Sequence, residues 1–142
     1  MPAPKTPLVS ADAIVEHQNS IVLIERKNPP YGLALPGGFI EIGEDVRTAV
    51  LRELKEETGL DAKVKAMLGV YSDPKRDPRG HVITLVFICE PEDITKLKGG
   101  DDAKRAFLIE IGKIPFEKLV FDHSQIIKDY IEWKKAPKVF IR

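Results

Sequence analysis

The chain has one cysteine in 142 residues, no net charge and no long apolar run, and each of these absences excludes a class of protein. A single cysteine, Cys89, excludes a disulfide within the chain and fits a reducing compartment. Its place in the apolar run ITLVFICE predicts a buried core position for its thiol.

The charges balance, because 22 basic residues face 22 acidic ones. We therefore expect no nucleic-acid partner and no membrane partner, since neither can be held by a net positive field, and any polyanion must be bound locally. No run approaches the roughly 20 apolar residues of a membrane span. The N-terminal MPAPKTPLVSADAIV lacks the basic segment and long apolar stretch of an export signal, which predicts a cytoplasmic protein.

The length and the 43% hydrophobic content suit one domain over residues 1–142 with one sizeable core. Two apolar segments joined by Gln18-Asn19 predict a hairpin, and Gly37-Gly38 predicts a break in regular structure where the backbone can take positive φ or approach a ligand closely. Strands on both sides of a central helix, with a second helix at the end, predict an α/β domain with a mixed sheet. The predicted strands are 8–17, 20–26, 33–36, 62–72, 81–90 and 106–111, and the terminal helix is about 122–135.

The central helix lies in GGFIEIGEDVRTAVLRELKEETGL, residues 37–60, which carries six acidic side chains. At about 100° per residue, its apolar side chains fill one arc and three glutamates fill the adjoining arc. Like charges at this spacing repel by a few tenths of a kcal/mol per exposed pair, and by more when they are partly desolvated. The glutamates are Glu53, Glu56 and Glu57.

A cation should therefore compensate these carboxylates. Arg52 can pair with Glu56 one turn away, but one guanidinium cannot neutralise the whole group. A hard divalent cation such as Mg²⁺ can, because it prefers oxygen ligands. The alternative is a solvated acidic helix with i,i+4 ion pairs, which leaves Gly37-Gly38 and the position of the glutamates beside the apolar arc unexplained.

The spacing within this stretch also carries a resemblance. Gly38 is followed after five residues by Glu44 and after seven more by Arg52, and RELKEETGL completes the pattern GX5EX7REUXEEXGU, in which U is apolar. This pattern resembles the Nudix box, here residues 38–60, so the chain is similar to Nudix hydrolases over nearly its whole length. The resemblance implies a Nudix-type α/β/α sandwich with a central mixed sheet.

The resemblance implies further that Glu53, Glu56 and Glu57 ligate Mg²⁺ or Mn²⁺, with the carbonyl of Gly37 as an additional ligand. The implied reaction is attack of water on a nucleoside diphosphate linked to another group. Glu44 and Arg52 are interpreted as a salt bridge that fixes the loop against the helix, with metal contact by Glu44 as the alternative.

The general base is not determined by the sequence. In Nudix hydrolases a glutamate often stands where this chain has Arg105. Asp101 and Asp102 are alternatives, although a turn or capping pair at the neighbouring Gly-Gly explains them as well. The other candidates are Glu90, Glu92 and Glu53.

Two loops resemble small ADP-ribose pyrophosphatases of this family, namely ERKNPPYGLALPGGF before the box and GVYSDPKRDPRGH after it. In the second loop, Arg76 and Arg79 are expected to clamp phosphate oxygens, or Arg79 only braces the loop through Asp77. In the first, Tyr31 or Phe39 is expected to stack on adenine beside Gly38, or these rings only pack against the protein. Arg26 and Lys27 are expected to contact either phosphate or only solvent. His81 and His123 are interpreted as structural residues.

The leading hypothesis is thus a Mg²⁺-dependent hydrolase of ADP-ribose that yields AMP and ribose 5-phosphate. Its rivals within the enzyme class act on oxidised or ordinary nucleoside triphosphates, dinucleoside polyphosphates or NADH. A rival of another class is a non-catalytic sensor of ADP-ribose-like ligands, although such regulators carry a DNA-binding domain for which 142 residues leave no room. The third hypothesis is an acidic interaction module without a small-molecule site. The resemblance also implies a homodimer.

Overall fold

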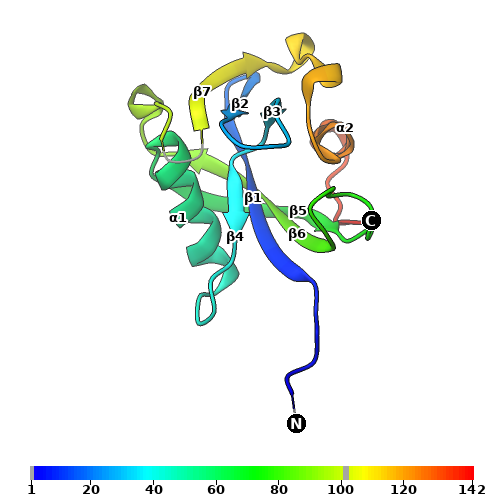
Figure 1. Ribbon diagram of the computed structural model, residues 1–142. Helices are drawn as coiled ribbons and strands as arrows, with labels where there is room; N and C mark the ends of the chain where they lie inside the picture. Colours follow the sequence, from blue (N-terminus) through cyan, green and yellow to red (C-terminus); the bar gives the residue numbers. More distant parts are fainter. Residues whose placement is uncertain (1, 101–102) are drawn as a thin grey trace.

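A mixed sheet forms the centre of the computed structural model, which describes residues 2–100 and 103–142 (Figure 1). Its strands run in the order β3-β2-β1-β6-β5-β8, with β4 paired to β1 and β7 paired to β2. The strands are β1 (Leu8–His17), β2 (Ser20–Arg26), β3 (Leu33–Ala34), β4 (Gly37–Phe39), β5 (Ala62–Tyr71), β6 (Val82–Pro91), β7 (Ala103–Glu110) and β8 (Phe140–Ile141). The helices are α1 (Val46–Thr58) and α2 (His123–Lys135), and the short 3-10 helices are η1 (Ile94–Lys96), η2 (Ile111–Lys113) and η3 (Phe116–Lys118).

Both parallel and antiparallel pairs occur in this sheet. Strand β1 is antiparallel to β2 and parallel to β6, and β8 is parallel to β5. The two residues between β1 and β2 include Gln18 with a φ of 54°, as a tight hairpin turn requires. The predicted hairpin and the predicted mixed sheet are therefore confirmed.

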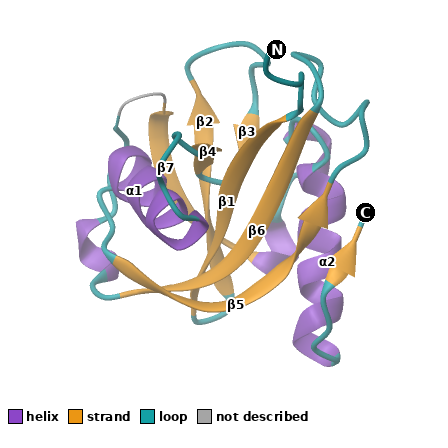
Figure 2. Cartoon of the chain, turned by 90° about the horizontal axis from the view of Figure 1, so that it is seen from below, coloured by secondary structure: helices purple, strands orange, loops and turns teal. Residues whose placement is uncertain are grey.

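Helices α1 and α2 cover opposite faces of the sheet (Figure 2). Successive side chains of β1 point to opposite faces, so Ala13 and Val15 pack on the side of α1, whereas Ile14 packs on the side of α2. Because both faces of β1 are covered, its middle positions are buried on both sides of the sheet. The predicted α/β/α sandwich is confirmed.

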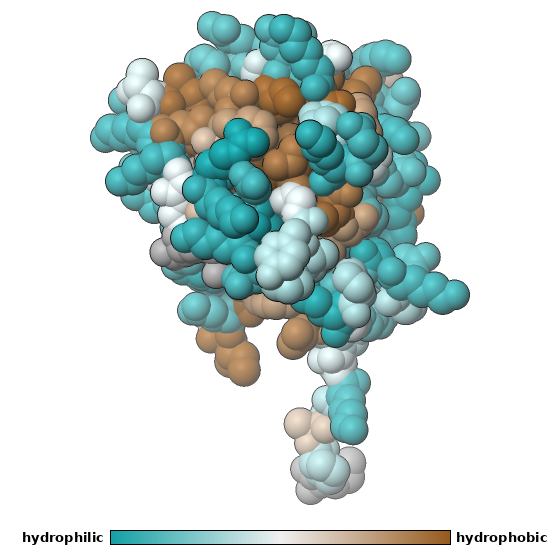
Figure 3. All heavy atoms as spheres, turned by 45° about the horizontal axis from the view of Figure 1, so that its top comes forward, coloured by the Kyte–Doolittle hydropathy of each residue, from teal (hydrophilic) through white to brown (hydrophobic). Residues whose placement is uncertain are grey.

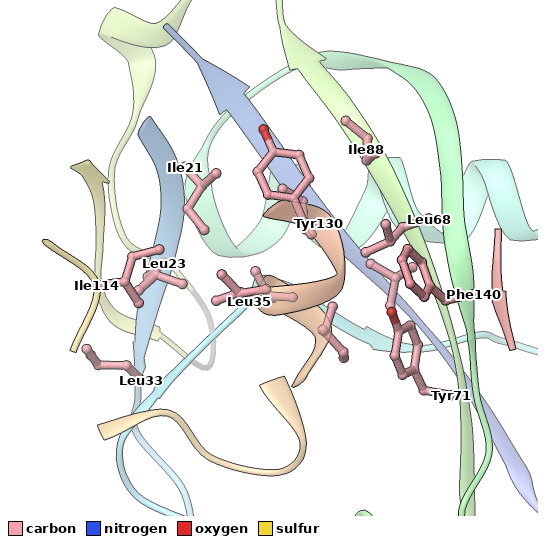
Figure 4. Packing of buried hydrophobic residues seen from close by; sticks show 14 residues of the cluster. Ile21, Leu23, Leu33, Leu35, Leu68, Tyr71, Ile88, Ile114, Tyr130 and Phe140 are labelled. Carbon is pink, nitrogen blue, oxygen red and sulfur yellow. The ribbon is translucent and has the colours of Figure 1, made fainter. Parts of the chain in front are cut away.

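Each face of the sheet has its own hydrophobic core. On the α2 side, Ile21 and Leu23 of β2 lie close to Leu35 and Tyr130 (Figure 4). The core on the α1 side contains Cys89, which is fully buried as predicted, and burial raises the pKa of its thiol to about 12.

The outer surface keeps some apolar side chains exposed. Figure 3 shows such side chains gathered at the end of the molecule that is uppermost in Figure 1, where β7 lies. A shallow hollow there is lined by apolar residues including Tyr31, Phe107 and Leu119. Within the described ranges, no helix is long and apolar enough to cross a bilayer.

Helix α1 begins and ends at residues that satisfy its free backbone groups. The side chain of Asp45 accepts a hydrogen bond from the N–H of Thr48 at 2.8 Å, as an N-cap does. At the other end, Gly59 has a φ of 75° and donates its N–H to the carbonyl of Lys55. The left-handed conformation predicted for Gly59 is thereby confirmed.

The prediction of a break at Gly37-Gly38 was wrong, because these residues belong to β4 and pair with Asp12 and Ala11 of β1. Neither glycine has a positive φ. They lack side chains for a steric reason instead. A Cβ at position 37 would lie 2.0 Å from Oδ1 of Asp12, and one at position 38 would lie 2.4 Å from Cδ of Glu53.

Candidate active site

A cleft of about 390 Å³ opens between α1, β1, β4, the β5–β6 loop and the turn before α2. Its location follows from the fold, because β4 pairs with β1 and packs against α1, which brings the glycine pair and the glutamates of residues 38–60 together. The polar side chains that line it include Ser10, Asp12, Arg26, Asn28, Glu41, Glu53, Glu57, Arg76, Asp77, Arg79, Thr84 and His123.

The acidic wall of this cleft is formed by two of the three predicted metal-binding glutamates. Glu53 and Glu57 lie one turn apart on α1, and both line the cleft. Glu57 is buried, and its Oε1 accepts a hydrogen bond of 2.8 Å from the N–H of Gly37. Glu56 is exposed and is not among the residues that line the cleft. Two carboxylates are therefore placed for joint use, and the third lies at the margin.

Arg52 lies among the acidic side chains of the box. Its Nε and Nη2 bind both carboxylate oxygens of Glu44 at 2.7 and 2.9 Å, as expected for the predicted salt bridge. Its Nη1 reaches Glu53 at 2.9 Å and Glu56 at 3.2 Å. The hydrogen bond from Arg52 is the main reason that the pKa of Glu44 falls to about 2, and Glu44 in turn raises the pKa of Arg52.

The donor set of the cleft suits a hard divalent cation. In the part of the chain that the structure describes, no three His, Cys, Asp or Glu side chains already converge as a complete metal site. Glu53 and Glu57 nevertheless present carboxylate oxygens to one cleft, which is the chemistry that Mg²⁺ or Mn²⁺ prefers. A cation bound to Glu53 would compete with Arg52 for the same carboxylate.

The β5–β6 loop supplies a guanidinium at the cleft. Asp77 accepts hydrogen bonds from the side chain of Arg79, the shortest being 2.8 Å to Nη2. Burial alone would raise the pKa of Asp77, but the hydrogen bonds from Arg79 outweigh it and the pKa lies below its usual value. The guanidinium of Arg79 also lies 5.2 Å from the ring centroid of Phe39 and 5.0 Å from that of Phe121. Arg79 thus braces its own loop and lines the cleft at once.

Arg76 has a different environment from Arg79. Its side chain is buried, and Asp122 accepts hydrogen bonds from its Nε at 2.9 Å and its Nη2 at 2.6 Å. Its Nη1 donates to the hydroxyl of Thr84 at 2.6 Å. These contacts tie the β5–β6 loop to the start of α2, so Arg76 is a buried part of the cleft lining, and its predicted contact with substrate stays a prediction.

Several other residues singled out from the sequence lie outside the cleft. Tyr31 is 67% exposed and borders the hollow beside β7, so the structure does not bring it to the predicted adenine site. Arg105 pairs with Glu25 at 2.8 Å. Glu90 pairs with lysines of β5, and like Glu92 it does not line the cleft. Asp101 and Asp102 lie outside the described residues, so their predicted role is untested.

Sequence reasoning missed a buried pair in the cleft. Oδ2 of Asp12 lies 3.2 Å from Nε2 of His123, and Nδ1 of His123 accepts the N–H of Leu35 at 2.9 Å. Because a backbone N–H can only donate, we infer that Nδ1 carries no proton and that the Nε2 proton faces Asp12. The available signal was Asp12 itself, a carboxylate between the apolar residues Ala11 and Ala13 of a predicted strand.

Comparison with known proteins identifies the family to which this chain belongs. The family model described as "NUDIX domain" matches residues 6–130, so the chain belongs to the Nudix family. This confirms the resemblance drawn from residues 38–60. The chain is 57% identical over 132 residues to an ADP-ribose pyrophosphatase of Methanocaldococcus jannaschii, a match that covers 92% of this chain and 76% of that relative.

Two solved structures are similar as well. One is a bifunctional NMN adenylyltransferase/ADP ribose pyrophosphatase of Francisella tularensis, complexed with AMP and a manganese ion, with a TM-score of 0.77 and 30% identity over 92% of this chain and 43% of that one. The other is the NUDIX domain of Shewanella oneidensis NrtR complexed with ADP ribose, with a TM-score of 0.77 and 25% identity over 90% of this chain and 88% of that one.

Proposed function

We propose that this chain is a divalent-metal-dependent hydrolase that cleaves ADP-ribose into AMP and ribose 5-phosphate. The observation that carries the proposal is that Glu53 and Glu57 line the same cleft as Arg79, so carboxylates for a cation and a cation for phosphate lie at one site. The 57% identity to an ADP-ribose pyrophosphatase supports ADP-ribose over other nucleotides.

In the proposed reaction, water attacks one phosphorus of the diphosphate, the P–O bond to the bridging oxygen breaks, and the proton of the water is released. A divalent cation, Mg²⁺ or alternatively Mn²⁺, would neutralise the phosphate oxygens and lower the pKa of the attacking water. Glu53 and Glu57 would hold that cation, with Glu56 and the carbonyl of Gly37 as further ligands. The hydrogen bond from Gly37 orients Glu57 for this role.

Substrate binding is assigned to the residues on the other side of the cleft. Arg79 would donate to phosphate oxygens, since its planar guanidinium suits bidentate contact and its side chain is 43% exposed. Phe39 offers a partly exposed ring for the base or the sugar, and Gly38 would serve the substrate site by leaving room for the carboxylate of Glu53 beside it. Glu44 and Arg52 would act by holding the loop before α1 in place.

The test is a substrate panel. Purified protein is incubated with ADP-ribose, NADH, a diadenosine polyphosphate or 8-oxo-dGTP, with and without Mg²⁺, and the products are separated by chromatography. We expect metal-dependent release of AMP and ribose 5-phosphate, fastest from ADP-ribose. Preference for another nucleotide would keep the Nudix chemistry and reject the substrate. Binding of ADP-ribose without any turnover would instead favour a ligand sensor, the candidate that the likeness to the NrtR domain supports.

The oligomeric state and the cellular compartment belong to the same proposal. We propose a homodimer in the cytoplasm. The hollow near Tyr31 supports the dimer, because its apolar lining, which includes Phe107 and Leu119, would be covered by a second copy. Light scattering after chromatography tests it, since a monomer mass would reject the dimer.

A further inference from the structure

The turn that precedes α2 contacts the cleft at consecutive positions. The N–H of Val120 donates to a carbonyl of β3 at 2.9 Å. Asp122 binds the buried Arg76, and His123 binds the cleft carboxylate of β1. Phe121, between them, also lines the cleft. The turn therefore fixes a loop and two strands around the site.

Phe121 adopts a backbone conformation that is rare for its residue type. Its φ is 56°, in the left-handed region, which is unfavourable for a bulky side chain. The other non-glycine residue with positive φ in the described ranges is Gln18, in the β1–β2 hairpin, where the turn type requires it. Phe121 is a central residue of the turn that is closed by the hydrogen bond from the N–H of His123 to the carbonyl of Val120 at 3.2 Å, and this turn directs its ring into the cleft lining.

The ring of Phe121 lies against two arginines of the cleft. The guanidinium carbon of Arg26 is 5.1 Å from the ring centroid, and that of Arg79 is 5.0 Å from it. Both distances are within the range of a cation–π interaction. Each guanidinium has a second anchor, since Pro30 accepts from Nε of Arg26 at 2.9 Å and Asp77 holds Arg79.

We propose that Phe121 is a positioning residue that holds Arg26 and Arg79 in the cleft for the diphosphate of the substrate. This inference rests on the proposed function, because it requires an anionic nucleotide in the cleft. Both guanidinium groups lie within about 5 Å of one ring in the lining of the same cleft, so the ring places them where they can bind one anionic ligand together. Phe121 itself need not touch the substrate.

Three variants separate the ring from the strained backbone. Phe121→Tyr keeps the ring and the strain, Phe121→Leu removes the ring and keeps the strain, and Phe121→Gly removes both. We expect Leu and Gly to raise KM for ADP-ribose about tenfold at nearly unchanged kcat, because two cation–π contacts are lost and phosphate contacts act on bound substrate and transition state alike. Phe121→Tyr should restore the wild-type KM.

A second readout uses salt. Added NaCl should raise KM of the wild type more steeply than KM of Phe121→Leu, because the two arginines no longer act together in the variant. Gln18→Gly is the matched control, since it relieves a similar backbone conformation far from the cleft, and we expect its KM and salt dependence to equal those of the wild type. A wild-type KM in Phe121→Leu would overturn the inference, as would a loss of activity that merely follows loss of folded protein in thermal unfolding.

The two proposals fail in different ways. A wild-type protein that does not hydrolyse ADP-ribose counts against the proposed function, and the same variants are then compared through the Kd of ADP measured by calorimetry. Weaker ADP binding by Leu and Gly, with Tyr equal to the wild type, still supports the positioning role. Equal binding by all four proteins, or no ADP binding by the wild type, would overturn it.

Discussion

The carboxylate of Glu53 occupies the space that a side chain of Gly38 would need. A Cβ at position 38 would lie 2.4 Å from Cδ of Glu53 and 2.6 Å from each of its oxygens. Real contacts of this kind do not occur, so either residue must move if position 38 gains a side chain. The glycine of the box is thus coupled to the glutamate fifteen residues later by direct packing, and both line the proposed catalytic cleft.

This contact predicts the effect of Gly38→Ala. Displacement of Glu53 by about 1 Å should lower kcat/KM for ADP-ribose about a hundredfold, because catalytic geometry is sensitive at that scale. The control is Gly112→Ala, since Gly112 lies in η2 with no atom near its missing Cβ and without positive φ. Steady-state kinetics and circular dichroism on both variants provide the measurement, and an unimpaired kcat/KM in Gly38→Ala would show that Glu53 is free to shift without consequence.

The Glu44–Arg52 salt bridge predicts a pH dependence of stability. The hydrogen bond from Arg52 lowers the pKa of Glu44 from its ordinary 4.5 to about 2 in the folded protein, so the ionised form stabilises the fold above about pH 4.5. That contribution should fade as the pH falls from 4.5 through 2. Urea unfolding of wild type and Glu44→Gln in metal-free buffer should therefore show a stability difference at neutral pH that closes in acid.

Glu41→Gln serves as the matched control for that experiment. Glu41 is also acidic and near Arg52, but its closest approach is 3.9 Å and it is exposed. Its replacement should leave the pH profile of unfolding close to that of the wild type. Parallel profiles for wild type and Glu44→Gln over the whole range would contradict the role of the salt bridge.

The buried pair of Asp12 and His123 predicts a difference between two substitutions. Asp12→Ala leaves the Nε2 proton of His123 buried without its acceptor and should cost about 1–3 kcal/mol of unfolding free energy. Asp12→Asn keeps a carbonyl oxygen as acceptor and should cost less. Denaturant unfolding of both variants measures the difference, and equal losses would mean that the hydrogen bond to His123 contributes nothing.

The contacts of Arg79 predict that a positive charge alone at position 79 is not sufficient for substrate binding. Arg79→Lys keeps the charge but loses the planar group that binds Asp77 and stacks on two phenylalanine rings, so KM for ADP-ribose should rise severalfold. Arg105→Lys is the control, because Arg105 is exposed and lies outside the cleft. Equal KM values for Arg79→Lys and the wild type would argue against a guanidinium contact with phosphate.

Local patterns in the sequence predicted most of the elements, but not the short strands β4 and β8. Apolar alternation and the hairpin turn predicted most ends of the other strands within one or two residues, and Gly59 marked the end of α1. Strand β7 begins earlier than predicted, at Ala103, within a polar segment that lacks apolar alternation. Pairing with β2 rather than hydrophobic pattern sets that end.

The cleft was only partly predictable, because its walls come from distant segments. Arg76 and Arg79 look equivalent in the loop and both line the cleft, but Asp122 from the turn before α2 binds the buried Arg76, whereas Arg79 stays 43% exposed. Asp12 and His123 meet across more than a hundred residues. The backbone conformation of Phe121 has no local sequence signal, since phenylalanine does not favour positive φ.

The most direct test of the cleft as the catalytic site is AMP release from ADP-ribose by wild type and Glu57→Gln, each with and without Mg²⁺. Glu57 is buried against Gly37, and Gln keeps its size and an oxygen for the Gly37 N–H while it removes the charge. We expect the wild type to require Mg²⁺ and Glu57→Gln to lose most of its turnover while its thermal unfolding is preserved. Unchanged, Mg²⁺-dependent turnover in Glu57→Gln would contradict the assignment of the cleft carboxylates to the metal.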